Sequence, residues 1–209
     1  MLKPINWKTF PRDFVVIQIG FALYGLAIAL LIRANLGASP WAVLEVALSQ
    51  WTSLTVGTTS ILVGLVVLAG ALALKEQVGW GTLANILFIG PWLDASLWLL
   101  PNITNNLPLQ IAYLLAAVAV MGIASAIYIG VKAGAGPRDS LMLAVNRTTG
   151  VSVRLARGAV EVSVVCAGWL LGGPLGLGTL AFAILIGPAV QWGFKAFNVK
   201  TGPPVTHEQ

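Results

Sequence analysis

Cysteine, histidine and charged residues are all scarce in this chain. Its 209 residues include one cysteine, Cys166, one histidine, His207, and only 9% charged residues. A single cysteine leaves no disulfide framework and no cysteine-based metal site. A single histidine, set in the polar segment 201–209, excludes Ser-His-Asp, Cys-His and multi-histidine metal chemistry. We therefore expect no enzymatic activity, no metal site and no cofactor.

Apolar side chains, by contrast, are abundant. Hydrophobic residues make up 57% of the chain, which is more than a soluble domain of this size can bury. A helix that crosses a bilayer needs about 20 mostly apolar residues. The sequence predicts six such helices, near residues 14–32, 57–74, 82–100, 109–131, 155–171 and 179–197. We expect an all-α integral membrane protein whose first partner is the lipid bilayer.

The second half of the chain repeats the first at a constant spacing of 97 residues. The Gly-Ala-Ser-Pro string at 37–40 returns as Gly-Ala-Gly-Pro at 134–137, and Gly90-Pro91 returns as Gly187-Pro188. Each Gly-Pro pair lies inside a predicted span and should kink it. We interpret the chain as one membrane domain with a cytoplasmic segment 1–13, repeat units 14–100 and 109–197, an outer linker 101–108 and a cytoplasmic tail 198–209.

Each unit also contains a segment that is too short and too polar to cross by itself. Ser39 and Pro40 begin the first of these segments, and Gly136 and Pro137 begin the second. Proline suits the first turn of a helix, where its missing N–H costs nothing, and serine suits the N-cap. We predict two short helices, starting at Pro40 and Pro137, that are re-entrant or lie at the membrane interface.

The distribution of lysine and arginine predicts the topology. These residues gather in alternate connections, at 1–13, 75–77, 132–157 and from 195 onward. The positive-inside rule then places both termini in the cytoplasm, and it explains the net charge of +5 more simply than nucleic-acid binding does. With three spans per unit, the second unit enters from the opposite side, which makes an inverted repeat. Arg33 is the exception on the outer side, where it would snorkel to the headgroups.

Paired charges occur in the second unit. Asp139 follows Arg138 directly, and Glu161 lies four residues after Arg157, on the same face of a helix. A carboxylate in the bilayer is costly unless it is paired, so we expect an Arg157–Glu161 ion pair, acting either as structural support or as part of a gate. Arg138 would add a fixed positive charge to the cytoplasmic side of a site, with Asp139 orienting it.

Two further acids lie in the first unit. Asp94 is inside the third predicted span with no basic residue close in sequence, and its counterpart is the neutral Gln191. Acids within a membrane are functional candidates, so a proton-titrating role and a helix-to-helix hydrogen bond both stay open. Glu45, on the first short helix, is expected to be wetted by the interface.

Three strings carry a resemblance to a known family. They are Gly-Ala-Gly-Pro-Arg-Asp at 134–139, the arginine-bounded segment 147–154, and 168–179, which begins Gly-Trp-Leu-Leu-Gly-Gly-Pro. From about residue 14 to 197 the chain resembles the YczE/YitT-type family of bacterial membrane proteins. The resemblance implies a small polytopic protein of the bacterial plasma membrane, and it implies no chemistry. Arg138 and Asp139 have no charged counterpart in the first unit, which argues against a strictly symmetric mechanism.

Two classes of function remain open. The first is a transporter or permease for a small solute, anionic or proton-coupled, whose site lies between the units where the two short helices aim their N-termini. The second is a non-transporting membrane partner, either a substrate-binding subunit or a regulator that acts through its basic cytoplasmic loop. A second copy of the chain or another membrane subunit could then be bound. Candidate substrate-binding or gating residues are Ser39, Pro40, Asp94, Gly136, Pro137, Arg138, Asp139, Arg157, Glu161 and Gln191.

Overall fold

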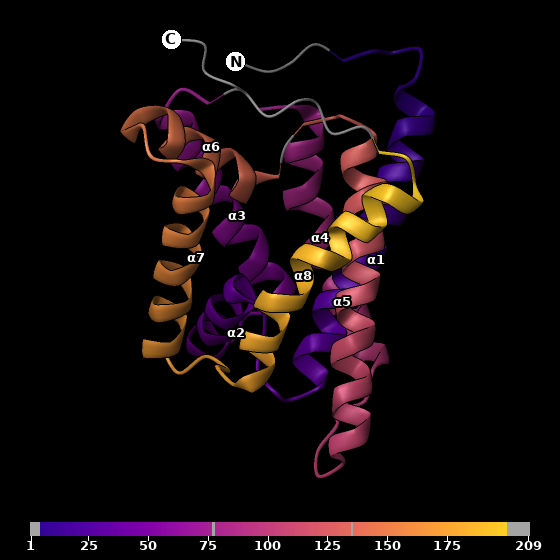
Figure 1. The fold of residues 1–209 in the computed structure, drawn as a ribbon, viewed down its shortest axis with the longest axis vertical. Helices are drawn as coiled ribbons and strands as arrows, with labels where there is room; N and C mark the ends of the chain where they lie inside the picture. Colours follow the sequence, from indigo (N-terminus) through magenta and orange to yellow (C-terminus); the bar gives the residue numbers. More distant parts are fainter. Residues whose placement is uncertain (1–4, 77, 135, 200–209) are drawn as a thin grey trace.

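The computed structural model describes residues 5–76, 78–134 and 136–199. Part of the predicted segment 1–13, most of the predicted tail 198–209, and His207 therefore lie outside the described residues. The described chain forms eight α-helices (Figure 1): α1 (Phe10–Arg33), α2 (Pro40–Thr52), α3 (Val56–Ala73), α4 (Trp80–Leu99), α5 (Leu107–Gly130), α6 (Pro137–Thr149), α7 (Val153–Leu170) and α8 (Leu177–Ala196).

Five of the eight described helices are long and apolar enough to cross a bilayer, namely α1, α3, α4, α5 and α8. They correspond to five of the six predicted spans. The sixth, α7, has 18 residues, as α3 does, but it carries Arg154, Arg157 and Glu161 and is not among the five. Figure 1 shows α7 running along the long axis of the molecule. That α7 crosses the membrane stays a prediction.

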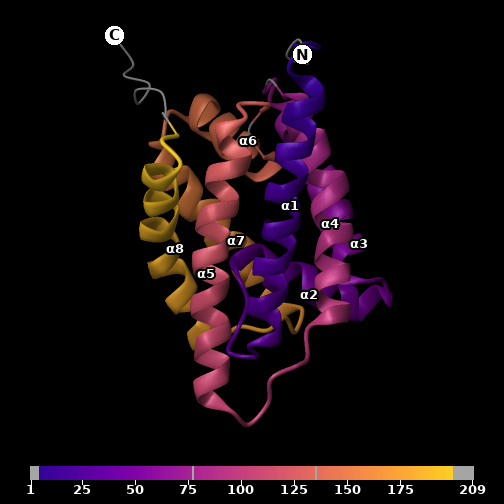
Figure 2. The same ribbon diagram turned by 90° about the vertical axis from the view of Figure 1, so that its right-hand side faces the viewer.

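The two short helices begin where the prolines predict. Pro40 and Pro137 occupy the first turns of α2 and α6, which are 13 residues long each. Ser39 stands at the N-cap of α2 as expected, but its side chain makes no capping hydrogen bond. Figures 1 and 2 show α2 in the lower half of the molecule and α6 near the upper end. The N-termini of these helices therefore come from opposite halves of the fold.

The helix bounds and several contacts recur at the 97-residue spacing. Each of α5 to α8 begins and ends 97 residues after its counterpart among α1 to α4. The amide of Gly81 donates to the carbonyl of Ala133 at 3.0 Å, and the equivalent of Gly81, Gly178, donates to Leu36, the equivalent of Ala133, at 2.7 Å. Such reciprocal contacts are the pattern that a twofold axis produces.

The Gly-Pro pairs do not interrupt their helices. Pro91 lies inside α4 and Pro188 inside α8, and both helices are continuous through the proline. The helices are therefore not divided at these pairs, and the effect expected from the sequence is a bend. Figure 1 shows α8 changing direction along its length, as a proline inside a helix favours.

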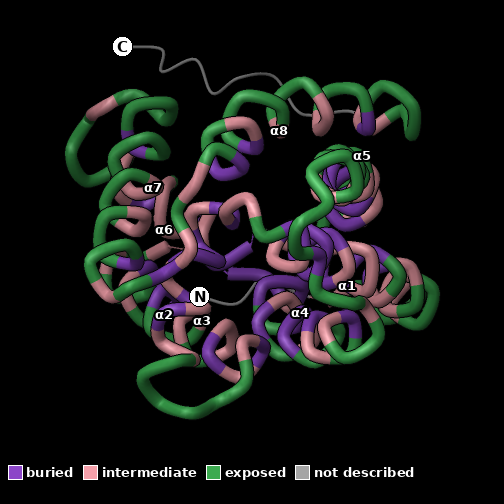
Figure 3. The backbone as a smooth tube through the Cα atoms, turned by 90° about the horizontal axis from the view of Figure 1, so that it is seen from below, coloured by how far each residue is buried: buried purple, intermediate pink, exposed green. Residues whose placement is uncertain are grey.

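The core forms around α1, which packs against both α5 and α4. Figure 3 shows buried residues gathered toward the centre and exposed ones toward the outer faces. Small residues permit close contacts between helix backbones. A Cβ on Gly25 would lie 2.7 Å from the amide nitrogen of Leu93 in α4, and one on Gly122 would lie 2.5 Å from the carbonyl oxygen of Ala189 in α8. Gly25 therefore lets α1 pack closely on α4, and Gly122 lets α5 pack closely on α8.

Arg33 makes a hydrogen bond that the sequence did not predict, while its snorkelling to the headgroups stays a prediction. Its guanidinium donates to the carbonyl oxygen of Leu97, and the residue is half-buried. That carbonyl belongs to the last turn of α4, where backbone oxygens lack partners within the helix. A basic side chain at a helix C-terminus satisfies such oxygens.

One helix pair differs between the two halves. α3 packs against α4, whereas α7 and α8 make at most marginal contact. A Cβ on Gly90 would lie only 2.4 Å from the carbonyl oxygen of Gly57, so the α3 and α4 backbones touch there. The equivalent positions hold Arg154 on α7 and Gly187 on α8, and a Cβ on Gly187 would meet nothing within 4 Å. The fold is therefore closed between α3 and α4 and open between α7 and α8.

Candidate functional site

A cavity of about 520 Å³ lies among the helices, and all eight contribute to its wall. Nine of the ten candidate residues predicted from the sequence lie on this wall. They are Ser39, Pro40, Gly136, Pro137, Arg138, Asp139, Arg157, Glu161 and Gln191. The fold thus brings together residues from α2, α6, α7 and α8 that are far apart in the sequence.

Much of the wall consists of equivalent positions from the two halves. Tyr24 and Met121 face the cavity together, as do Trp41 and Arg138, and Ser60 and Arg157. The lining residues that have no equivalent on the wall, such as Tyr128, Asp139 and Gln191, all belong to the second half. The cavity therefore lies between the halves and extends toward the open side at α7 and α8.

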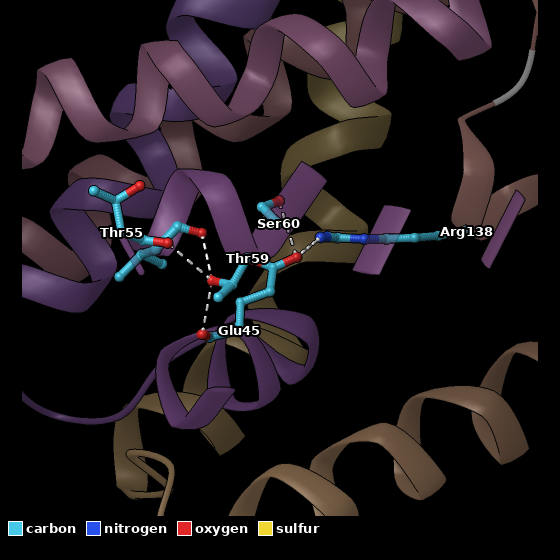
Figure 4. Close-up of polar contacts among 6 residues, drawn as sticks. Glu45, Thr55, Thr59, Ser60 and Arg138 are labelled. Atoms are coloured by element: carbon cyan, nitrogen blue, oxygen red, sulfur yellow. Dashed lines mark hydrogen bonds and ion pairs between the residues drawn. The ribbon is translucent and has the colours of Figure 1, made fainter. Parts of the chain in front are cut away.

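Glu45 is fully buried, so the expectation that it is wetted by the interface is wrong. Its Oε1 atom accepts hydrogen bonds from the Arg138 guanidinium and, at 3.0 Å, from the Ser60 hydroxyl (Figure 4). The Arg138 guanidinium also lies 4.8 Å from the ring centroid of Trp41. An ion pair thus joins α2 to α6 across the two halves, while Oε2 of Glu45 is buried without a partner among the described residues.

The sequence repeat could have identified Glu45 as the partner of Arg138. Trp41 and Arg138 occupy equivalent positions, so a twofold relation brings the first turns of α2 and α6 face to face. Glu45 follows Trp41 by four residues and lies on the same face of α2. A long side chain such as that of Arg138 can reach past Trp41 to this next turn.

Asp139 lies on the cavity wall, half-buried, and does not orient Arg138 as the sequence suggested. Its carboxylate forms no hydrogen bond and no ion pair with any residue that the structure describes. A Cβ built on Gly136 would lie 3.5 Å from Asp139 Oδ2, 3.5 Å from the Tyr128 hydroxyl oxygen and 3.8 Å from the Asn85 side-chain nitrogen. Three polar groups from α6, α5 and α4 thus converge on one point.

The predicted Arg157–Glu161 ion pair is confirmed, with Nε of Arg157 3.0 Å from Oε1 of Glu161. Both side chains are partly exposed, at 57% and 36%. The pair is local, one turn apart on α7, and a pair this exposed contributes at most about 1 kcal/mol to stability. It faces the side of the cavity on which α7 and α8 stand apart.

Asp94 is the one predicted candidate that does not line the cavity. Its Oδ2 accepts a hydrogen bond from the Thr55 hydroxyl at 2.6 Å, and its Oδ1 accepts one from the Gly57 amide at 2.8 Å. Thr55 is the N-cap of α3, so the carboxylate lies at the positive end of that helix. Of the two interpretations left open, the contacts favour the helix-to-helix hydrogen bond.

These features define an α-helical membrane protein with a charged cavity at its centre. A family of unknown function, DUF6198, matches the chain over residues 11–195, and the chain belongs to this family.

Three other proteins are similar to this chain in sequence. The chain is 35% identical over 201 residues to the uncharacterized membrane protein YczE of Bacillus subtilis, covering 89% of this chain and 93% of that protein. It is 32% identical over 186 residues to an uncharacterized protein of Haemophilus influenzae, covering 89% and 85%. A second Bacillus subtilis protein, YyaS, is 28% identical over 173 residues, covering 81% and 86%. No solved structure gives a significant match. The resemblance to the YczE-type family is thus confirmed.

Proposed function

We propose that this protein is a transporter for a small solute and that the cavity between its two halves is the solute site. The observation that carries the proposal is the wall itself, in which equivalent residues of both halves surround a charged space of about 520 Å³. Ligand pockets commonly measure about 300–1,000 Å³. Transporters built from inverted repeats place their sites between the repeats.

The arrangement proposed is two inverted units of three spans, with α7 as the sixth span and both termini cytoplasmic in a bacterial plasma membrane. Three features support it: the reciprocal contacts between the halves, the placement of α2 and α6 toward opposite ends of the molecule (Figure 2), and the alternation of basic connections. An arginine and a glutamate on α7 are tolerable in a span because they pair with each other and face the cavity.

In this scheme the structure represents one of two access states. The side at α3 and α4 is closed by backbone contact at Gly57 and Gly90 and by the Glu45–Arg138 pair. The side at α7 and α8 is open. Alternating access exchanges the open and closed sides around a fixed site. Of the solute classes expected from the sequence, the anionic one is less favoured, because the guanidiniums of Arg138 and Arg157 already bind carboxylates.

The proposed topology predicts which connections face outward. In a variant with Cys166 replaced by alanine, single cysteines at Asn102 and Leu175 are expected to react with a membrane-impermeant thiol reagent applied to intact cells. A cysteine at Thr149 should react only after the membrane is permeabilised. All three positions are exposed, so the substitutions should cost little. Labelling of Asn102 and Thr149 variants from the same side would refute the inverted plan.

Transport is tested with the purified protein in liposomes, under an imposed pH gradient and with a panel of organic cations, anions and neutral metabolites. We expect flux of at least one solute class and its loss, by about tenfold or more, in Gly187→Trp, which fills the cavity from α8. Gly158→Trp is the matched control, because a Cβ at either glycine meets nothing within 4 Å but only Gly187 lines the cavity.

The same experiment addresses the second class of function. If the parent protein moves none of the solutes alone but co-purifies with a membrane protein that does, the chain is a non-transporting partner. Equal flux in the parent and in Gly187→Trp would place the transport path elsewhere.

A further inference from the structure

We propose that the cavity binds an organic cation, a protonated or quaternary amine, with the carboxylate of Asp139 as its counter-ion. The binding of the cation is argued from the residues of the cavity alone. Its passage across the membrane rests on the proposed transport function.

The charges of the cavity argue for a cationic ligand. Two arginines and two acids line its wall, namely Arg138, Arg157, Asp139 and Glu161, and Glu45 lies directly behind Arg138. Arg138 is paired with Glu45, and Arg157 is paired with Glu161. Counted by formal charge, the cluster of three acids and two arginines has one excess negative charge, and Asp139 is its one acid without an ion pair among the described residues.

No other charged side chain that the structure describes lies on the wall. Arg147 is held by Glu76, and Arg154 is exposed at the start of α7 without lining the cavity. An unpaired carboxylate within a membrane protein is costly, and charges interact more strongly there than in water. One cation close to Asp139 removes this cost.

The surroundings of Asp139 favour an organic cation over an inorganic one. Its Oδ2 atom, the Tyr128 hydroxyl and the Asn85 amide surround one point beside Gly136, and this group supplies a single carboxylate. Inorganic cations such as Ca²⁺ prefer a shell of six or more oxygen ligands. The wall of the same cavity also carries rings and aliphatic groups, including those of Tyr24, Met121 and Phe182. Aromatic faces attract ammonium groups, and the aliphatic groups suit the hydrocarbon part of an amine.

The ring of Trp41 is not available for this purpose, because the Arg138 guanidinium already lies over it. A ligand ammonium is therefore directed to the Asp139 side of the cavity, next to Tyr128.

The position of Gly136 allows the site to be tested by changing its shape as well as its charge. An added methyl group there would make ordinary van der Waals contact with all three polar groups and would fill the point on which they converge.

The probe pair is benzyltrimethylammonium and benzenesulfonate, which are similar in size and carry fixed charges of opposite sign. Binding to the purified protein in detergent is measured by isothermal titration calorimetry. We expect saturable binding of benzyltrimethylammonium and none of benzenesulfonate. Asp139→Asn, which keeps the size of the side chain, should weaken binding by about tenfold or more. Gly136→Ala should weaken it similarly while leaving the charge in place. Glu76→Gln, which removes a negative charge outside the cavity, should bind as the parent does.

Each outcome decides the proposal, once thermal unfolding shows that a variant is folded. Equal binding by the parent and Asp139→Asn, tighter binding of benzenesulfonate, or no saturable binding of benzyltrimethylammonium by the parent would overturn it. Saturable, Asp139-dependent binding without flux in liposomes would uphold the cation site and refute transport. Flux of a solute that Asp139→Asn leaves unchanged would uphold transport and refute the cation site.

Discussion

Replacing Arg138 with methionine is expected to lower the free energy of unfolding by about 3 kcal/mol or more, because the buried carboxyl group of Glu45 would lose its counter-ion. Glu45 is 0% exposed, and only the Ser60 hydroxyl would remain as a partner for its carboxylate. Arg138 is partly exposed, at 32%, so most of the loss comes from the stranded acid. The measurement is denaturant unfolding of the purified protein in detergent.

A double variant separates the stranded charge from lost packing. Glu45→Met combined with Arg138→Met replaces the buried pair with apolar side chains and should recover most of the stability, since buried pairs are often replaceable in this way. Arg157→Met is the matched control, because it breaks a pair that is largely exposed and should cost less than about 1 kcal/mol. Equal losses in Arg138→Met and Arg157→Met would contradict the central role given to the Glu45–Arg138 pair.

The second large effect is expected from a single methyl group at Gly90. A Cβ there would lie 2.4 Å from the Gly57 carbonyl oxygen, a backbone atom that can move only if α3 moves with it. Overpacking in a well-packed region costs about 1–3 kcal/mol and occasionally more, so we expect Gly90→Ala to lose about 3 kcal/mol. It should also open the closed side at α3 and α4.

The equivalent substitution in the second half provides the control. A Cβ on Gly187 meets nothing within 4 Å, and alanine favours a helix over glycine by about 1 kcal/mol. Gly187→Ala should therefore be neutral or slightly stabilising in the same unfolding measurement. If Gly90→Ala and Gly187→Ala behave alike, α3 and α4 are not in backbone contact as described.

Local rules account for what the sequence predicted correctly. Pro40 and Pro137 start helices because a proline ring suits the first turn, and Arg157 meets Glu161 because residues four apart share a helix face. The repeat spacing of 97 residues, in turn, holds for the bounds of all eight described helices. None of these inferences needs knowledge of which helices touch.

The errors came from contacts that only the packed structure decides. Glu45 looked like an interfacial acid because its partner, Arg138, lies 93 residues away. Asp94 looked isolated because its partners are a hydroxyl and a backbone amide on α3 rather than a basic residue. The hydrogen bond of Arg33 was missed because the free carbonyl at the end of α4 is not visible in the sequence. The convergence of Asp139, Tyr128 and Asn85 also needed three helices to be placed in space.

The unequal glycines of the two halves have a consequence for the balance between access states. On the closed side, Gly57 and Gly64 let α3 approach α4, whereas the equivalent positions on α7 carry Arg154 and Glu161. If α7 approached α8 as closely as α3 approaches α4, these charged side chains would have to leave their present surroundings. In the proposed transport scheme, the closure of α7 on α8 is therefore looser than that of α3 on α4. We then expect the two access states to differ in free energy, with most molecules in the conformation described here until a bound ligand shifts the balance.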